Sequence, residues 1–139
     1  TLYNHYSITD FIPQRAPFIM VDKVIVCEEK LFKTTFEVKE DNLFLEKGIL
    51  SESAILENIA QTCAAGMGCY SKMNTKEEVK TGFIGSINKV EVFAPAHSGD
   101  TIHTEVTILQ QLGNIFLIEG IAKTEKNQVL VKCQMKIVA

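Results

Sequence analysis

The stretch at residues 48–71, GILSESAILENIAQTCAAGMGCYS, decides the fold of this chain, because it contains no lysine or arginine and has the periodicity of one long helix. At about 100° per residue, bulky side chains fall on one side of that helix and small ones on nearly the opposite side. The bulky stripe consists of Ile55, Leu56, Ile59, Cys63 and Met67, and the other stripe of Ala54, Glu57, Gln61, Ala64, Ala65 and Gly68. A surface helix carries charges on its outer face, so we expect this helix, which lacks lysine and arginine and has no charged face, to be covered on both faces.

Glu57 is then a carboxylate that is at least partly removed from water. Desolvation disfavours the charged form of a carboxyl group, which suits such a group to proton transfer. The alternative is a carboxylate satisfied by backbone or arginine partners inside a subunit interface. The helix by itself leaves both interpretations open.

Further stretches have the pattern of β-strands. Residues 32–39 alternate between apolar and polar side chains and residues 18–27 are rich in strand-forming types, so we expect these two stretches to form a hairpin. The other strands are expected at residues 83–93, 101–109, 115–122 and 129–138. Their short connections favour antiparallel neighbours. The predicted fold class is α+β, with a curved antiparallel sheet of about six strands wrapped around one long central helix.

The composition indicates a single folded domain at residues 1–139, since 46% of the residues are hydrophobic. With 14 basic and 17 acidic residues, the chain offers no basic surface for nucleic acid or an anionic membrane. No apolar run approaches the ~20 residues that span a bilayer, and the N-terminal residues do not resemble a secretion signal. We therefore expect a cytoplasmic protein without a membrane span.

The sequence contains no motif for a metal or a cofactor. Its 4 cysteines include no CxxC pair, and Cys63 and Cys133 lie on apolar stripes, where free thiols behave as small hydrophobic groups. His103 falls on the polar face of its strand, and no HExxH, P-loop, GxGxxG or GxSxG pattern occurs. We expect neither a bound metal nor a cofactor.

Near the N-terminus, Pro13 and Pro17 restrict the backbone around Gln14 and Arg15, which predicts a rigid loop that leads into the first strand. Arg15 and Asp22 are expected to support this loop, for example as an ion pair. Starting the strand is a sufficient structural reason for such a loop, and presenting Gln14 to a site is the functional one.

Three segments together resemble the β-hydroxyacyl-acyl-carrier-protein dehydratases. IPQRAPFIMVDKV at residues 12–24 is similar to the family's front motif, and ILENIAQTCAA at residues 55–65 to its central-helix motif. GFIGSINKVEVFAPAHSGDTI at residues 82–102 resembles the glycine-containing strand and the turn that follow. The resemblance implies the hotdog fold, in which a sheet curls around one long helix.

The resemblance also implies the site residues. In that family a catalytic histidine follows the proline of the front motif and a catalytic acid lies on the helix, often meeting across a dimer interface; here Gln14 and Glu57 occupy these positions. Ser51, Glu52 and Ser53 stand where the family tends to have Pro-Gly and an apolar residue. The implied site has Glu57 and Gln14 as catalytic residues and Gln61, Ser53, Pro17, Phe18 and Gly85 as substrate-binding residues.

Gln14 leaves the function open, because an amide cannot carry a proton in the working pH range. The first hypothesis is a 3-hydroxyacyl-acyl-carrier-protein dehydratase of fatty-acid or polyene-type acyl chain synthesis, acting on a thioester of acyl carrier protein or coenzyme A. The second is a non-catalytic partner subunit of an active, histidine-bearing dehydratase paralogue. The third is a hotdog thioesterase that uses Glu57. In each case we expect a homodimer or higher oligomer, or a heteromer, because the small-residue helix face and the strand edges need cover.

Overall fold

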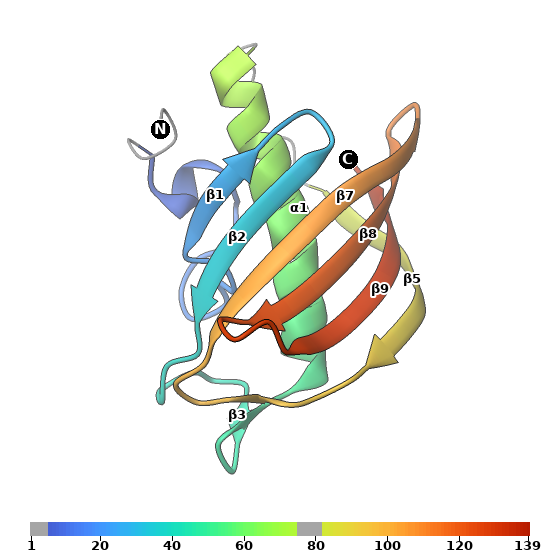
Figure 1. The fold of residues 1–139 in the computed structure, drawn as a ribbon. Coiled ribbons are helices and arrows are strands. Elements are labelled where there is room, and N and C mark those ends of the chain that lie inside the picture. The colour runs from blue at the N-terminus through green and yellow to red at the C-terminus, as the bar shows by residue number, and fades with distance from the viewer. Residues whose placement is uncertain (1–5, 75–81) are drawn as a thin grey trace.

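The computed structural model describes residues 6–74 and 82–139 and has one long helix held in a curved antiparallel sheet (Figure 1). The sheet has six strands in the order β1-β2-β7-β8-β9-β5. Its strands are β1 (Lys23–Cys27), β2 (Leu31–Glu37), β5 (Phe83–Val92), β7 (Thr101–Leu112), β8 (Ile115–Thr124) and β9 (Val129–Val138). The predicted α+β class and the arrangement that the hotdog fold implies are both confirmed.

The first hairpin is shorter than predicted. β1 and β2 pair antiparallel, but residues 18–22 precede β1 instead of belonging to it. The physical reason lies at Met20, whose N–H donates to Gln61 Oε1 at 2.7 Å and whose carbonyl accepts from Asn58 Nδ2 at 2.6 Å. Helix side chains thus replace the strand partners that these backbone groups would otherwise need.

The central helix α1 (Glu52–Asn74) begins later than predicted and ends later too. Its expected first residues instead form β4 (Ile49–Leu50), which pairs with β3 (Leu45–Glu46) and β6 (Ala96–His97) in a small second sheet. Ser51 caps the helix, because its hydroxyl accepts the Ala54 N–H at 3.2 Å. Residues 72–74, which follow the predicted helix, continue it, and residues 75–81 lie outside the described residues.

The predicted turn at residues 110–114 is also shorter than expected. β7 continues to Leu112, where it pairs with Ile115 of β8. The turn itself has Gly113 at φ 60, a left-handed conformation that glycine adopts without steric cost.

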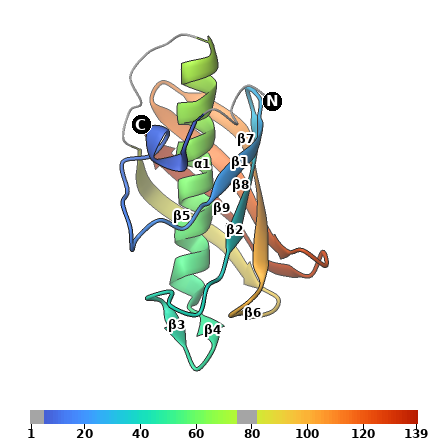
Figure 2. The same cartoon turned by 90° about the vertical axis from the view of Figure 1, so that its left-hand side faces the viewer.

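Close contacts fix the helix against its surroundings. Gly66 faces the Phe32 ring so closely that a Cβ atom would overlap it. A Cβ on Gly68 would lie 2.5 Å from the carbonyl oxygen of Phe11, which belongs to the segment before β1. Figure 2 shows this segment crossing over α1 between the short helix η2 (Ile8–Asp10) and β1. The helix is therefore covered by the sheet on one side and by the front segment, residues 6–22, on another.

A buried polar network ties the helix to two strands. Thr62 Oγ1 donates to the Asn58 carbonyl at 2.8 Å, so the hydroxyl of Thr34 on β2 must be the donor in its 2.7 Å bond to Thr62. On β7, Thr104 Oγ1 donates to Asn58 Oδ1 at 2.5 Å. These polar side chains are buried yet hydrogen-bonded, as stable interiors require.

Strand β5 forms one end of the main sheet and is unusually open to water. It pairs with β9 along one edge, and every residue except Ser86 is exposed. Its apolar residues include Phe83, exposed by 67%, and Val92, exposed by 46%. An edge strand with such side chains can accept another chain.

Candidate active site

One cavity of about 300 Å³ contains the predicted catalytic residues. It lies along α1 and is bordered by the front segment, by the start of β5 and by the end of β9. The lining residues are Gln14, Glu57, Ala60, Gln61, Ala64, Met67, Gly82, Phe83, Ile84, Ile137 and Ala139. We call it the Glu57 cavity.

The structure brings Gln14, Glu57 and Gln61 together within a single chain. Glu57 is partly buried, and Gln61 Nε2 donates to its Oε1 at 3.5 Å. Gln14 Oε1 is buried, and within the described part of the chain no group hydrogen-bonds to it. A buried acceptor without a partner costs roughly 1–3 kcal/mol, so a donor that entered the cavity would be bound favourably.

Gln61 forms most of its hydrogen bonds with backbone groups of the front segment. Its Oε1 accepts from Met20 N, and its Nε2 donates to the Phe18 carbonyl at 2.9 Å. Its longer hydrogen bond, to Glu57, is the one that contacts a predicted catalytic residue. With Asn58, which holds the Met20 carbonyl, Gln61 fixes the segment that carries Gln14 to the helix that carries Glu57.

The other predicted substrate-binding residues do not line the Glu57 cavity. Ser53 is exposed in the first turn of α1, and Gly85 is exposed on β5 beyond the lining residues. Pro17 lines a different cavity of about 280 Å³ next to Asp22. The ring of Phe18 is 54% exposed and lies 6.5 Å from the Phe44 ring.

The expected support of the loop by an Arg15–Asp22 ion pair is replaced by backbone contacts. Arg15 Nη1 donates to the carbonyls of Ile12 and Gln14, both at 2.8 Å. Asp22 Oδ2 accepts from the N–H of Glu37 at 2.7 Å. Both residues are structural as predicted, but each one stiffens its own end of the loop.

The sequence did not indicate the residues that line the part of the cavity distant from Glu57. Met67 belongs to the predicted bulky stripe and Ala64 to the small-residue stripe, yet both line this cavity, and nothing in the sequence indicates that Ile84 and Ile137 line it with them. The available signal was helical spacing, since positions 57, 60, 64 and 67 lie on one face.

Thiol chemistry is disfavoured in this protein. Burial raises the pKa of Cys63 to about 12 and that of Cys133 to about 11. Burial also raises the pKa of Cys27 and of Cys69. These thiols remain protonated near neutral pH and are poor nucleophiles.

Residues 6–74 and 82–139 contain neither a metal-binding cluster nor a membrane-spanning helix. No group of three or more His, Cys, Asp or Glu side chains gathers there in a way that could hold a metal ion. In those same ranges no helix is long and apolar enough to cross a membrane.

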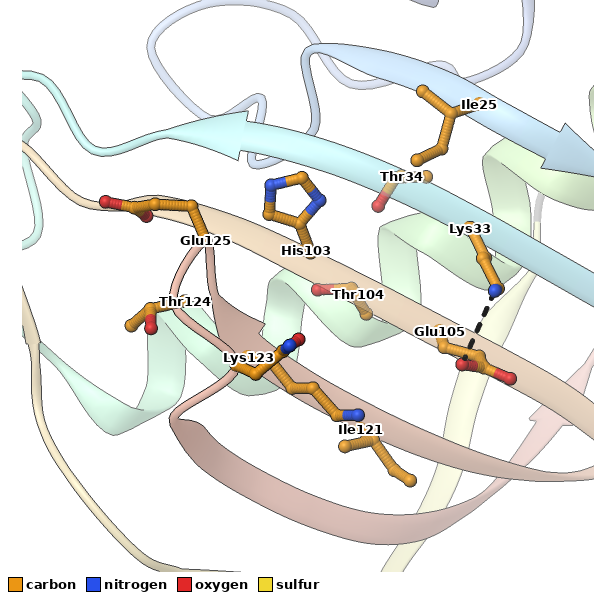
Figure 3. A pocket seen from close by; sticks show the side chains of 11 residues that line it. Ile25, Lys33, Thr34, His103, Thr104, Glu105, Ile121, Lys123, Thr124 and Glu125 are labelled. Carbon is orange, nitrogen blue, oxygen red and sulfur yellow. Dashed lines mark ion pairs between the residues drawn. The ribbon is translucent and has the colours of Figure 1, made fainter.

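A second cavity, of about 340 Å³, lies on the outer face of the sheet (Figure 3). Three of its charged side chains have partners in the protein: Lys33 Nζ lies 3.9 Å from Glu105 Oε2, and Glu125 Oε2 accepts from Thr101 N at 2.7 Å. His103 is exposed there, as its strand position predicted. The unpartnered buried oxygen lies in the Glu57 cavity instead, which makes that cavity the better candidate for a site.

Known proteins resemble this chain over nearly its whole length. The ApeP-like family model, described as ApeP dehydratase, matches residues 6–139. The 3-hydroxyacyl-[acyl-carrier-protein] dehydratase FabZ of Petrotoga mobilis is 29% identical to this chain, over 96% of this chain and 96% of the relative. FabZ of Aliivibrio fischeri is 27% identical, over 96% of this chain and 91% of the relative.

Solved structures share the fold. A chain of the dehydratase heterocomplex ApeI:P from Xenorhabdus doucetiae superimposes with a TM-score of 0.87 at 19% identity, over 96% of this chain and 90% of the other. A hypothetical thioesterase with coenzyme A from Streptococcus pneumoniae superimposes with a TM-score of 0.67 at 7% identity, over 84% and 83%.

Proposed function

We propose, from the premise that this chain belongs to the ApeP-like dehydratase family, that the Glu57 cavity binds a 3-hydroxyacyl thioester. In this proposal, Glu57 takes the α-proton of the thioester during dehydration and gives it to the leaving hydroxyl. The observation that carries this proposal is the juxtaposition of a partly buried carboxylate with the unpartnered buried oxygen of Gln14. A 3-hydroxyl group is a donor that suits Gln14 Oε1, and the neighbouring α-carbon carries the proton that a base must remove.

The reaction balances with a single proton carrier. The Glu57 carboxylate takes the α-proton, and the electron pair of that C–H bond forms the new C=C bond as the C–O bond to the 3-hydroxyl breaks. The leaving hydroxyl takes the same proton back from Glu57 and departs as water, which restores the carboxylate. Gln14 orients the hydroxyl but cannot titrate, so one positioned acid–base group is missing and a rate deficit of roughly 10²–10⁴ is expected relative to a two-group site.

A histidine supplied by another subunit is the proposed remedy for that deficit. The open edge of β5 borders the cavity through Phe83 and Ile84, so a second hotdog chain could add to the sheet and complete the site. The structural neighbour ApeI:P is described as a dehydratase heterocomplex, which supports a heteromer. We infer that the thioester is carried by acyl carrier protein, in keeping with the names of the FabZ relatives.

The test measures the carrier by mass spectrometry. A 3-hydroxyacyl carrier protein is incubated with wild-type protein, with Gln14→His and with Gln14→His/Glu57→Gln. We expect slow or undetectable loss of water with the wild type alone, a rise of at least about 10²-fold with Gln14→His, and loss of that gain in the double variant. Gln14→Asn is the matched control, since it changes the residue without adding a titrating group.

The alternatives give different mass changes. If Glu57-dependent release of the whole acyl group occurs instead, the protein is a thioesterase. If none of the variants acts alone but the wild type speeds dehydration by a histidine-bearing paralogue, it is a partner subunit. Fast dehydration by the wild-type chain on its own would refute the stated need for a second proton carrier.

A further inference from the structure

Two of the 4 cysteines meet where β1 packs against α1. Cys27 is the last residue of β1, and Cys69 lies in the C-terminal half of α1. The strand and the helix are neighbours in the fold (Figures 1 and 2). Cys27 packs against the buried cluster that contains Cys69, and the two thiols interact through a hydrogen bond. Their sulfur atoms are therefore within reach of each other in the folded chain.

The glycine at position 66 permits this close approach. Cys27 pairs with Phe32 across the β1–β2 hairpin, and the Phe32 ring occupies the space that a Cβ on Gly66 would fill. The hairpin thus lies directly on the helix backbone, and Cys27 Sγ donates to the Gly66 carbonyl oxygen at 3.4 Å. Cys69 follows Gly66 by three positions, which places both on one face of the helix. The contact between the two thiols is therefore fixed by the packing of the hairpin.

The other two cysteines belong to a different part of the interior. Cys63 and Cys133 lie in the main core cluster, which is separate from the cluster of Cys69. Burial alone accounts for the raised pKa of Cys63 and of Cys133. For Cys27, burial is the largest cause of the raised pKa, and the neighbouring Cys69 thiol adds to it. The structure singles out one pair, and the other two thiols serve as internal controls.

We propose that Cys27 and Cys69 are a site of oxidative modification, where a low-molecular-weight disulfide such as oxidised glutathione converts the two thiols into a disulfide that joins β1 to α1. The bond closes a loop that contains residues 28–68. Such a cross-link stabilises a folded chain mainly by restricting the unfolded chain. Phe11 and Ile12 of the front segment pack in the same cluster, so the bond also restrains the surface on which that segment rests.

The exchange takes place in two steps. Cys27, the more exposed of the pair, attacks one sulfur of oxidised glutathione as a thiolate, and one glutathione leaves. The Cys69 thiolate then attacks Cys27 Sγ in this mixed disulfide and expels the second glutathione. The two protons from the protein thiols end on the two glutathione thiols, so the protein is oxidised by two electrons and the glutathione disulfide is reduced by two. Burial keeps both protein thiols protonated near neutral pH, which slows the exchange, so the equilibrium is the quantity to measure.

Refolding brings the thiols to equilibrium. The purified, reduced chain is unfolded in urea and diluted into buffers with several ratios of reduced to oxidised glutathione, while a parallel set stays in urea. Both sets are quenched with acid, alkylated in denaturant and digested with trypsin. The bridge joins the peptides of residues 24–30 and 48–72, and fragmentation in the mass spectrometer distinguishes Cys69 from Cys63. We expect the equilibrium constant for the Cys27–Cys69 bridge to be about 30- to 1,000-fold larger in the native set than in urea, because stability and bridge formation are linked.

Variants separate the pair from the other thiols. Cys27→Ala should abolish the bridge without creating another link. Cys63→Ala is the matched control, because it removes a buried cysteine of the same helix and should leave the bridge in place. In thermal unfolding followed by circular dichroism, the bridged wild type should melt about 10 °C above the reduced wild type. Cys27→Ala should melt at the same temperature in oxidising and reducing buffer.

Three results would overturn the proposal. The first is an equilibrium constant in the native set that is no larger than in urea. The second is a native set dominated by free thiols, by glutathione mixed disulfides or by a link to Cys63 or Cys133. The third is a bridged protein that melts no higher than the reduced protein. Neither Glu57 nor Gln14 takes part in this chemistry, so the proposed dehydration stands or fails separately.

Discussion

Replacing Gly68 by alanine should destabilise the protein, although the same change in an exposed helix stabilises it. Alanine is favoured over glycine by about 1 kcal/mol at a helix interior position. Here, however, the added Cβ would lie 2.5 Å from the Phe11 carbonyl oxygen and 3.1 Å from Phe11 Cα, well inside ordinary carbon contacts of about 3.5–4.0 Å. The obstacle is backbone, so it cannot rotate out of the way as a side chain could.

The cost comes from moving the front segment away from α1. Phe11 is 2% exposed and packed in its cluster, so we expect an overpacking cost of about 2–3 kcal/mol and, after the helix gain, a net loss of about 1–2 kcal/mol in the free energy of unfolding. Urea denaturation followed by circular dichroism measures this loss as a lower transition midpoint at unchanged slope.

Gly85→Ala provides the control for adding one methyl group. A Cβ there would be 3.4 Å from the Lys136 carbonyl oxygen and 3.5 Å from Val138 Cγ2, which are ordinary contacts. We expect a change between zero and a gain of about 1 kcal/mol. A stabilised Gly68→Ala protein would show that the front segment yields freely, which contradicts the close packing described above.

The remaining predictions concern the buried network, the thiols and one carboxylate. Asn58→Ala should cost about 2–4 kcal/mol in the free energy of unfolding, because it leaves the Met20 carbonyl and the Thr104 hydroxyl buried without their partner; urea denaturation checks this, and a loss below about 1 kcal/mol would contradict it. Cys63 and Cys133 should resist iodoacetamide at neutral pH and react only on unfolding, as followed by peptide mass spectrometry, since burial raises the pKa of both thiols; rapid alkylation in the native protein would refute this. Hydrogen bonds from the backbone N–H groups of Glu125 and Thr101 lower the pKa of the Glu125 carboxyl from 4.5. The small contribution of Glu125 to stability is therefore present above pH 4.5 and is lost as the pH falls through the lowered pKa. A carbon-13 NMR titration of this carboxyl with a midpoint at or above 4.5 would be inconsistent with this prediction.

The fold was largely predictable because local patterns and tertiary packing agree. The stretch around Glu57 that lacks lysine and arginine forms most of the central helix, and the alternation at β2 does place Phe32 and Phe36 inside. The errors occur where distant partners override local preference. Ile49 pairs with His97 instead of joining the helix, and Met20 binds helix amides instead of a strand.

The candidate site was predictable only in its polar part. Gln14 and Glu57 were identified through motifs, and the structure places both on one cavity. The apolar part depends on the pairing of β5 with β9, which brings Phe83 and Ile84 of β5 and Ile137 of β9 to the cavity. Residues 93–128 separate the two strands, and register between strands so far apart in the sequence cannot be deduced from either strand alone.

The hydrogen bonds between α1 and the front segment also affect how the chemistry of this chain can change during evolution. The side chains of Asn58 and Gln61 form hydrogen bonds with backbone atoms of Met20 and Phe18. A carbonyl of this kind is present in every amino acid, so these bonds do not depend on the side chains of the front segment. The side chain of Gln14 takes no part in these hydrogen bonds. Codons for glutamine and histidine differ by one base, so a single mutation can exchange an orienting amide for a proton carrier while the scaffold that presents it stays the same.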